Sequence, residues 1–479
     1  MILRVIDHPY EFDMKNLCIT FFPHEKIRLE GEEDPVVVTT RRETDGSFFV
    51  SAKVYDVYRE TTAKPEPADE EHLVLSVTLY RLLSGILGFA PPWGVLYGVR
   101  PAKLMHRLCA QMGDDAAVAH FQTAFLTQKS KAELAHEVML HENRSIARSG
   151  PKSFSLYVSI PFCPTRCAYC SFVSHSIEKT HKLMTPYVDL LLRELEETAK
   201  YAKELGLELA TVYFGGGTPT TLSAQDLGRI FSTIEQNFDL SHLMEYTVEA
   251  GRPDTVTRER LEVIRAAGVQ RISINPQSFN DKVLEAIGRR HTAQQTLDAF
   301  ALARDCGFDH INMDFIAGLP EDDLPSFQRS IQTALDLQAE SITVHTLALK
   351  TSAYMVTREQ TFDLKDRLTV SNMVDYAGQT LHGAGYYPYY MYRQSKSLGN
   401  LENVGWCKLG YDCLYNVYMM DETHTVLAVG AGAVTKLRGQ NSGMIERIYN
   451  YKYPYEYIRD FDTLLERKKR IPGFYAEYD

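Results

Sequence analysis

Short apolar runs alternate with amphipathic segments through the middle of the chain, between residues 154 and 350. The apolar runs have the length of buried strands, and the segments between them place apolar residues at helical spacing. This alternation predicts a parallel β/α array, and its six units suit a partial (β/α)6 barrel. We expect strands at 155–160, 210–214, 246–250, 271–275, 311–316 and 341–347, and helices that include 187–205, 223–237, 257–267 and 292–305.

The regions on either side of this array differ from it. Residues 1–150 are expected to form an N-terminal α+β accessory domain, with strands at 35–40 and 48–54, a polar linker at 61–71, and helices at 72–87 and 116–142. Ser149-Gly150-Pro151 should end the last helix before the barrel, which we place at 151–385. Residues 386–479 are rich in Tyr and Gly and are expected to form a small C-terminal domain. That domain either packs its own aromatic side chains or covers a flat aromatic substrate.

Composition narrows the class of protein without naming a function. The chain has 479 residues, 44% apolar and 24% charged, which is ordinary for a globular protein of two or three domains. Its formal net charge of −11 does not favour nonspecific nucleic-acid binding. No signal peptide is apparent, and the most apolar run, 83–97, is too short and too interrupted by Pro91-Pro92 to span a membrane. We expect a cytoplasmic protein, since cysteine-ligated clusters and unpaired thiols suit a reducing compartment.

Three cysteines in one short segment carry the strongest chemical signal. Cys163, Cys167 and Cys170 have the spacing C-x3-C-x2-C. Three thiolates can hold three irons of a [4Fe–4S] cluster and leave the fourth iron open to a small molecule, whereas electron-transfer clusters usually have cysteine on all four. Zinc sites usually have four ligands built from C-x2-C pairs, and no second pair is present here. The other five cysteines are scattered and are expected to be buried thiols.

Further polar or glycine-rich motifs follow the expected strands. Gly215-Gly216-Gly217-Thr218-Pro219-Thr220 comes after the second strand, Glu249 ends the third, Gln277 follows the fourth, and Asp314 lies in the fifth. Catalytic loops of a β/α barrel collect at the carboxyl ends of its strands, so these motifs should meet at one mouth. Glycine lets a backbone approach a ligand closely, although a tight strand–helix turn explains a lone glycine run equally well. A carboxylate ending a buried strand, such as Glu249, is costly without a partner.

The segment from Leu156 to Phe172 and these motifs, in this order, resemble the radical SAM (S-adenosylmethionine) superfamily. The sequence around the cysteines is similar to that of one branch of the superfamily. This branch contains oxygen-independent coproporphyrinogen III oxidases (dehydrogenases), heme chaperones, and related methyltransferases and heme-degrading enzymes. The segment from Trp93 to Pro101 resembles the longer, HemZ-type members of that branch. The resemblance implies the partial (β/α)6 radical SAM barrel, a [4Fe–4S] cluster on the three cysteines, and SAM as second cofactor.

Site residues follow from the resemblance position by position. The resemblance implies that Tyr157 and the segment 215–218, which includes Gly216, contact the cluster-bound SAM. Glu249 is the candidate to accept hydrogen bonds from a ribose or an ammonium group. Some coproporphyrinogen dehydrogenases hold a second SAM beside the first. Its family positions fall here on Tyr169, Gly217, Thr218, Gln277, Arg289, Asp314 and Ala348. For Arg289 and Asp314, an interior ion pair is the structural alternative.

The activity that the resemblance implies is decarboxylation of coproporphyrinogen III propionates to vinyl groups, giving protoporphyrinogen IX for heme biosynthesis. A tetrapyrrole substrate and a reductase such as flavodoxin or ferredoxin are the implied partners. The candidate cations for the propionates are Arg252, Arg290, Arg393 and Lys396. For each of them, an ordinary solvated surface charge is the alternative.

Two departures keep other functions open. Coproporphyrinogen dehydrogenases have a fourth cysteine two residues after the last ligand, where this chain has Phe172, and their Tyr/Arg/Pro-rich N-terminal segment has no match here. A heme-binding chaperone of the same family is the first rival. A radical SAM methyltransferase or heme-opening enzyme acting on a tetrapyrrole is the second.

Overall fold

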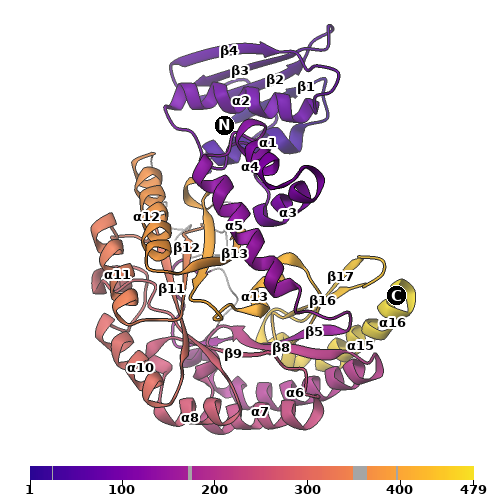
Figure 1. Cartoon of the computed structure of the whole chain (residues 1–479), viewed down its shortest axis with the longest axis vertical. Coiled ribbons are helices and arrows are strands. Elements are labelled where there is room, and N and C mark those ends of the chain that lie inside the picture. The colour runs from indigo at the N-terminus through magenta and orange to yellow at the C-terminus, as the bar shows by residue number, and fades with distance from the viewer. Residues whose placement is uncertain (24, 171–174, 349–363, 395–396) are drawn as a thin grey trace.

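A four-stranded sheet forms the N-terminal end of the molecule in the computed structural model, which describes residues 1–23, 25–170, 175–348, 364–394 and 397–479. Its strands are β1 (Ile2–Ile6), β2 (Val36–Arg42), β3 (Phe48–Val54) and β4 (Val57–Ala63), in that spatial order. Helices α1 (Glu11–Phe21) and α2 (Glu71–Leu87) pack beside the sheet (Figure 1) and share a separate apolar core with it. The two predicted strands and the helix at 72–87 are confirmed.

Two predictions for this region are wrong in part. The expected linker 61–71 begins inside a strand, because residues 61–63 complete β4 and pair with β3. The expected helix 116–142 is two helices, α4 (Asp114–Thr123) and α5 (Lys129–Ile146), preceded by α3 (Pro101–Met112). Leu126, between α4 and α5, has φ 56°, a left-handed conformation that cannot continue a helix. Apolar side chains of α3–α5 pack into the core of the barrel rather than into that of the N-terminal sheet.

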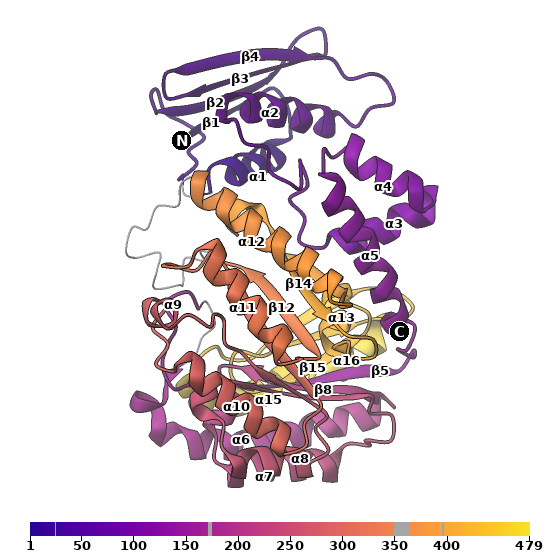
Figure 2. The ribbon, with the colours of Figure 1, turned by 60° about the vertical axis from the view of Figure 1, so that its left-hand side comes forward.

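Six parallel strands form the predicted barrel sheet. They lie in chain order as β5 (Ser153–Ile160), β8 (Glu208–Gly216), β9 (Glu245–Gly251), β10 (Arg271–Ile274), β11 (His310–Ala317) and β12 (Ser341–Thr346). Helices line the outside of the sheet (Figures 1 and 2): α6 (Ile177–Glu204), α7 (Ala224–Asn237), α8 (Arg258–Ala266), α9 (Asp281–Ala286), α10 (Ala293–Asp305), α11 (Leu324–Asp336) and α12 (Leu364–Gly383). All six strand predictions are confirmed, as is the open, partial barrel.

Strands from the tail extend this sheet at both open edges. β14 (Glu402–Cys407) pairs antiparallel with β12, and β13 (Tyr387–Arg393) pairs with β14. At the other edge β15 (Thr425–Val429) runs parallel to β5 and is followed by β16 (Val434–Arg438) and β17 (Ile445–Tyr449). The strands of the tail therefore extend the open barrel sheet on both sides. The domain boundaries at 150 and 385 stay predictions. Its helices are α13 (Leu414–Asp421), α14 (Pro454–Arg459), α15 (Phe461–Lys468) and α16 (Arg470–Tyr478).

A fully buried ion pair joins α15 to α6. Lys468 Nζ lies 2.7 Å from Glu194 Oε1, and neither side chain is exposed. The Gly430 amide and the Tyr457 hydroxyl, each at 2.7 Å, donate to Glu194 Oε2. A buried charge is tolerated when its partners surround it in this way.

Lys468→Met should lower the free energy of unfolding by about 3–5 kcal/mol, because the Glu194 charge is left without its cation. Lys469→Met is the matched control, since Lys469 pairs with Glu466 at the surface and such pairs contribute little. Urea unfolding followed by circular dichroism measures both variants. Equal unfolding midpoints for the two variants would contradict the prediction.

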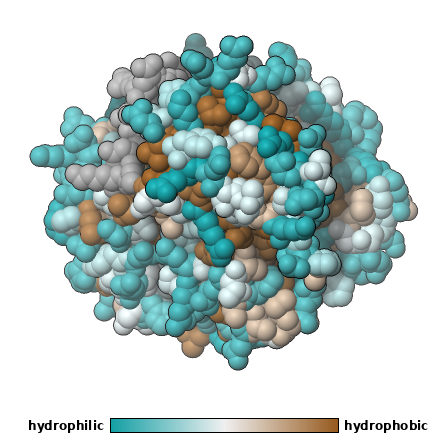
Figure 3. All heavy atoms as spheres, turned by 90° about the horizontal axis from the view of Figure 1, so that it is seen from above, coloured by the Kyte–Doolittle hydropathy of each residue, from teal (hydrophilic) through white to brown (hydrophobic). Residues whose placement is uncertain are grey.

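The face at the N-terminal end of the long axis is mixed in character. Polar residues cover most of it, and apolar residues gather in limited areas between them (Figure 3). Among the helices of the described residues, none combines the length and the apolar character that crossing a bilayer requires.

Candidate functional site

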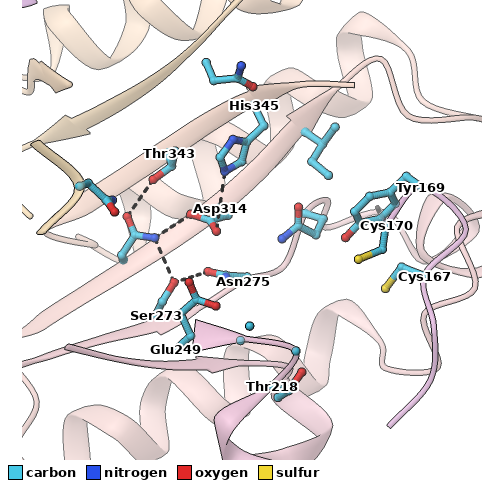
Figure 4. Close-up of a pocket in the computed structure, with 18 of the residues that line it drawn as sticks. Cys167, Tyr169, Cys170, Thr218, Glu249, Ser273, Asn275, Asp314, Thr343 and His345 are labelled. Carbon is cyan, nitrogen blue, oxygen red and sulfur yellow. Dashed lines mark hydrogen bonds and ion pairs between the residues drawn. The ribbon is translucent and has the colours of Figure 1, made fainter. Parts of the chain in front are cut away.

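A cavity of about 550 Å³ opens at the carboxyl ends of the barrel strands. Every residue predicted for the cluster or for SAM lines it, which agrees with the expectation that the motifs meet at one mouth. The volume is in the range of ordinary cofactor sites. Figure 4 shows Cys167, Tyr169 and Cys170 on one wall, with Asp314 and His345 on the opposite wall. The lining residues from the predicted set are Tyr157, Cys163, Cys167, Tyr169, Cys170, Gly216, Gly217, Thr218, Glu249, Gln277, Arg289, Asp314 and Ala348.

The cysteine segment begins with a strand pair at the edge of the cavity. β6 (Phe162–Cys163) pairs in parallel with β7 (His175–Ser176). The Ala168 amide donates to the Ile287 carbonyl at 3.0 Å, so the loop also rests on the segment that follows α9. The Cys170 amide donates to the Cys167 carbonyl at 3.2 Å. These contacts hold all three thiols at one cavity.

The glycine-rich segment is explained first by packing. The Gly217 amide donates to Ile160 at 2.7 Å, and a Cβ on Gly217 would lie 2.6 Å from the Phe162 carbonyl oxygen. Gly216 has φ 102°, which also favours glycine. The close approach that requires glycine is therefore to the strand that leads into the cysteines. Thr218 Oγ1 lies 3.5 Å from Cys163 Sγ, so the same packing brings the segment to the cluster ligands.

Glu249 lines this cavity, and its local partner is a tyrosine. The Tyr213 hydroxyl donates to Glu249 Oε1 at 2.6 Å. Burial raises the pKa of Glu249 to about 7, although the hydrogen bond from Tyr213 lowers it. An ionised Glu249 can accept hydrogen bonds from an amino group or a ribose hydroxyl, and a protonated one loses most of that capacity.

Glu249→Gln should weaken SAM binding about 10- to 100-fold at pH 8, since a hydrogen bond to a charged group is worth roughly 1.5–3 kcal/mol. Because the pKa of Glu249 is raised to about 7, the carboxylate is ionised above pH 7 and protonated below it. The wild-type advantage over Glu249→Gln should therefore shrink as the pH falls from 8 to 6. Equilibrium dialysis with labelled SAM measures both proteins. An advantage that is the same at both pH values would remove Glu249 from the SAM site.

The remaining polar residues of the predicted set divide between two networks. Arg289 donates to the Asn275 carbonyl at 2.6 Å and to the Tyr169 hydroxyl at 3.2 Å. Asp314 instead accepts from Asn312 at 2.7 Å and lies 3.8 Å from His345 Nε2 (Figure 4). Burial raises the pKa of Asp314, but His345, Asn312 and Thr343 lower it more, so the pKa stays below its usual value.

The interior ion pair considered for Arg289 and Asp314 is not formed. Among the ion pairs of the described residues, none joins these two side chains. Gln277, which follows β10, has φ 67°, and its amide donates to the Asp314 carbonyl at 2.9 Å. A left-handed conformation at a residue other than glycine is uncommon and often marks a functional site.

The four proposed cations for propionates have other surroundings. Arg290 is exposed and pairs with Glu178 at 2.8 Å. Arg393 is buried, donates to the Leu96 carbonyl at 2.7 Å and lies outside the cavity lining. Arg252 lines the cavity but contacts the cysteine loop. Lys396 lies outside the described residues, as does Phe172.

A fifth cation, Arg271, was missed by sequence reasoning. It is the first residue of β10, is 1% exposed and lines the cavity. Its Nε and Nη1 atoms have no hydrogen-bond partner among the described residues. The buried Glu245 carboxylate offsets part of its charge, and a water or an anionic group in the cavity would satisfy the two remaining nitrogens. In the sequence Arg271 looked like the polar start of a strand, and no local pattern pointed to its side chain.

Comparison with known proteins gives this geometry its family. Residues 157–334 match the model of the radical SAM superfamily. The chain is 34% identical over 470 residues to the oxygen-independent coproporphyrinogen-III oxidase-like protein HemZ of Bacillus subtilis, covering 95% of this chain and 94% of HemZ. This chain belongs to the radical SAM superfamily. Its resemblance to the HemZ type, inferred above from the motifs, is confirmed.

The chain is also similar to a heme chaperone in sequence and to a coproporphyrinogen III oxidase in structure. The chain is 31% identical to the heme chaperone HemW of Bacillus subtilis, over 64% of this chain and 79% of HemW. The solved structure of coproporphyrinogen III oxidase HemN from Escherichia coli, a radical SAM enzyme, superposes with a TM-score of 0.51 at 22% identity. It covers 68% of this chain and 72% of HemN, and at this identity it supports the fold alone.

The cofactors of the superfamily, a [4Fe–4S] cluster and SAM, fit the residues present. Three cysteines line one cavity, and no disulfide joins any cysteine of the described residues. Three thiolates suit a cluster with one open iron. Glu249 and the polar edge of the glycine-rich segment share the cavity and can accept or donate hydrogen bonds to a bound SAM.

Proposed function

We propose that this chain is a radical SAM oxidoreductase that decarboxylates the propionates of coproporphyrinogen III without oxygen. At each propionate the carbon β to the carboxylate loses a hydrogen atom, and the carboxylate leaves as CO2. One electron passes to an acceptor, and a vinyl group remains. Two rounds convert coproporphyrinogen III to protoporphyrinogen IX. The near full-length similarity to a coproporphyrinogen-III oxidase-like protein supports this substrate class.

The observation that carries the proposal is the single cavity that holds both the cluster residues and Arg271, a buried cation two of whose nitrogens make no hydrogen bond within the described residues. When bound, the cluster and SAM supply the 5′-deoxyadenosyl radical that takes the hydrogen atom. The chain's own residues position the reactants. Glu249 would accept hydrogen bonds from SAM, and the positive charge of Arg271 would attract an anionic group of a ligand in the cavity that both residues line. A carboxylate is the group that a guanidinium binds with two parallel hydrogen bonds.

Aromatic side chains support a flat substrate at the same place. Tyr390 and Tyr392 of β13 stack with ring centroids 6.2 Å apart, and both line the cavity. Tyr415 of α13 lines it as well. Two interpretations of the Tyr-rich tail were considered. Tyr389 is fully buried and packs in the protein interior, whereas the three lining tyrosines can contact a ligand.

A heme chaperone is the second candidate. Phe172 stands where the dehydrogenases have a fourth cysteine, and the chain is 31% identical to a heme chaperone. Such a protein would keep the cluster and bind heme without converting a porphyrinogen.

Anaerobic incubation with dithionite, SAM and coproporphyrinogen III, followed by mass spectrometry, tests the proposal. Decarboxylated porphyrin is expected from the wild type and none from Cys167→Ser. Arg271→Gln should require more substrate for the same rate, whereas Arg290→Gln, an exposed arginine outside the cavity lining, should behave as wild type. Unchanged substrate together with stoichiometric heme binding would favour the chaperone, and a methylated product would favour a methyltransferase.

The proposed reaction also sets the partners. One electron must enter for each SAM cleaved, so a low-potential carrier such as flavodoxin or ferredoxin is proposed as reductase. A reducing cytoplasm is the compartment in which such a cluster and its thiols persist.

A further inference from the structure

Arg252 follows β9, and its side chain reaches the cysteine loop. Its side chain is 4% exposed and is held by a two-pronged ion pair with Asp254. Nε lies 2.9 Å from Oδ1, and Nη2 lies 2.8 Å from Oδ2. Such a pair fixes the plane of the guanidinium, so the direction of the remaining nitrogen, Nη1, is set by Asp254.

That remaining nitrogen points at the cluster loop. Nη1 donates to Thr165 Oγ1 at 3.0 Å and lies 3.9 Å from Cys167 Sγ. Thr165 Oγ1 in turn donates to the Gly288 carbonyl at 3.3 Å. Cys167 is 9% exposed, so its sulfur meets this cation with little water between them. Sequence analysis placed Arg252 among the propionate cations, and these contacts direct it elsewhere.

Arg252 is one of two guanidiniums that face this sulfur from the elements packed around it. Arg289 faces it from the cavity side, where it also donates to the Asn275 carbonyl and the Tyr169 hydroxyl. His291 is 3% exposed, and burial and the two neighbouring guanidiniums lower its pKa to about 3, so it carries no charge at neutral pH. Asp254 offsets part of the Arg252 charge, which leaves the directed N–H group as its main effect on Cys167.

We propose that Arg252 is a positioning residue that raises the reduction potential of the cluster through the Cys167 sulfur. The potential of an iron–sulfur cluster depends on its net charge and on hydrogen bonds to its sulfurs. A reduced cluster carries one more negative charge, so a donor with positive charge at a ligand sulfur stabilises the reduced form more than the oxidised form. The inference rests on the cluster assignment and is independent of the substrate.

Arg252→Gln tests it in anaerobically purified, cluster-loaded protein. The variant keeps a polar side chain and loses the charge and the fork. At a fixed solution potential, its ratio of reduced to oxidised cluster should fall at least tenfold, which is 59 mV for one electron. Electron paramagnetic resonance during a redox titration measures this ratio. Arg258→Gln is the matched control, because Arg258 also donates to a thiol, Cys306, that is not a cluster ligand.

Iron content and melting temperature of the same preparations separate a tuning role from a structural one. Full iron with the tenfold shift supports the proposal, and full iron with a ratio within twofold of wild type overturns it. If Arg252→Gln loses iron, Arg252→Lys decides the matter, because it keeps the charge. The proposal is supported if the Lys variant keeps its iron and its ratio of reduced to oxidised cluster differs from that of the wild type by less than tenfold. Loss of iron in both variants overturns it in favour of a brace for the loop.

Discussion

Protein with Cys163→Ser, Cys167→Ser or Cys170→Ser should be colourless after anaerobic purification, whereas the wild type should be brown with about four irons and four sulfides per chain. The cluster has three protein ligands, and a serine hydroxyl at one of them is a poor replacement for a thiolate. None of the five other cysteines, all of which lie among the described residues, lines this cavity, so none can replace the lost ligand. Iron and sulfide analysis with an absorption spectrum measures the effect.

The chain supplies its own controls for this result. Cys407 and Cys413 are fully buried thiols of the tail, and neither lines the cavity. Burial raises the pKa of both thiols, so they stay protonated and unsuited to iron. Cys407→Ser and Cys413→Ser should keep the full cluster. Full iron in Cys167→Ser would refute the assignment of the ligands.

The barrel could be predicted from the sequence because its signals are local. Each of the six barrel strands is a short, largely buried segment, and amphipathic segments separate them. The edges of the sheet could not be predicted. Whether β14 and β15 form their own sheet or extend the barrel depends on pairing with strands far away in sequence, and alternation within a strand does not encode its neighbour.

The site divides in the same way. Residues in motifs, such as Glu249 and Gln277, were placed correctly because each follows a strand whose end must lie at the mouth. Arg252 and Arg271 were not, since an arginine side chain is long and reaches groups or cavities that other elements of the fold form. The breaks within the N-terminal region were missed for a related reason. Leu126 adopts a left-handed conformation that no residue preference announces.

Asp314→Asn should separate SAM cleavage from porphyrin turnover. Asp314 lies on the wall opposite Cys167 and Cys170 (Figure 4), and its partners are Asn312 and His345 rather than the cysteine loop. Loss of its charge should therefore spare the cluster and the first SAM. If Asp314 holds a second SAM or the substrate, the variant should still form 5′-deoxyadenosine with dithionite while porphyrin product falls by at least tenfold.

Asp314 and Arg289 do not pair in the structure, so a loss of product in Asp314→Asn can be separated from a loss of stability. An interior ion pair would leave a buried charge when one partner is removed, at a cost of about 3–5 kcal/mol, and the variant would melt early. Without that pair, Asp314→Asn keeps a side chain of the same shape that can still bond to Asn312. Melting temperature and iron should stay near wild type. His345→Gln is the companion variant, since it removes the imidazole that faces Asp314 on the same wall and leaves the carboxylate. If both variants are stable and iron-replete and give wild-type porphyrin yield, the ligand does not contact this wall, and the second site has to lie nearer Tyr169 and Arg289.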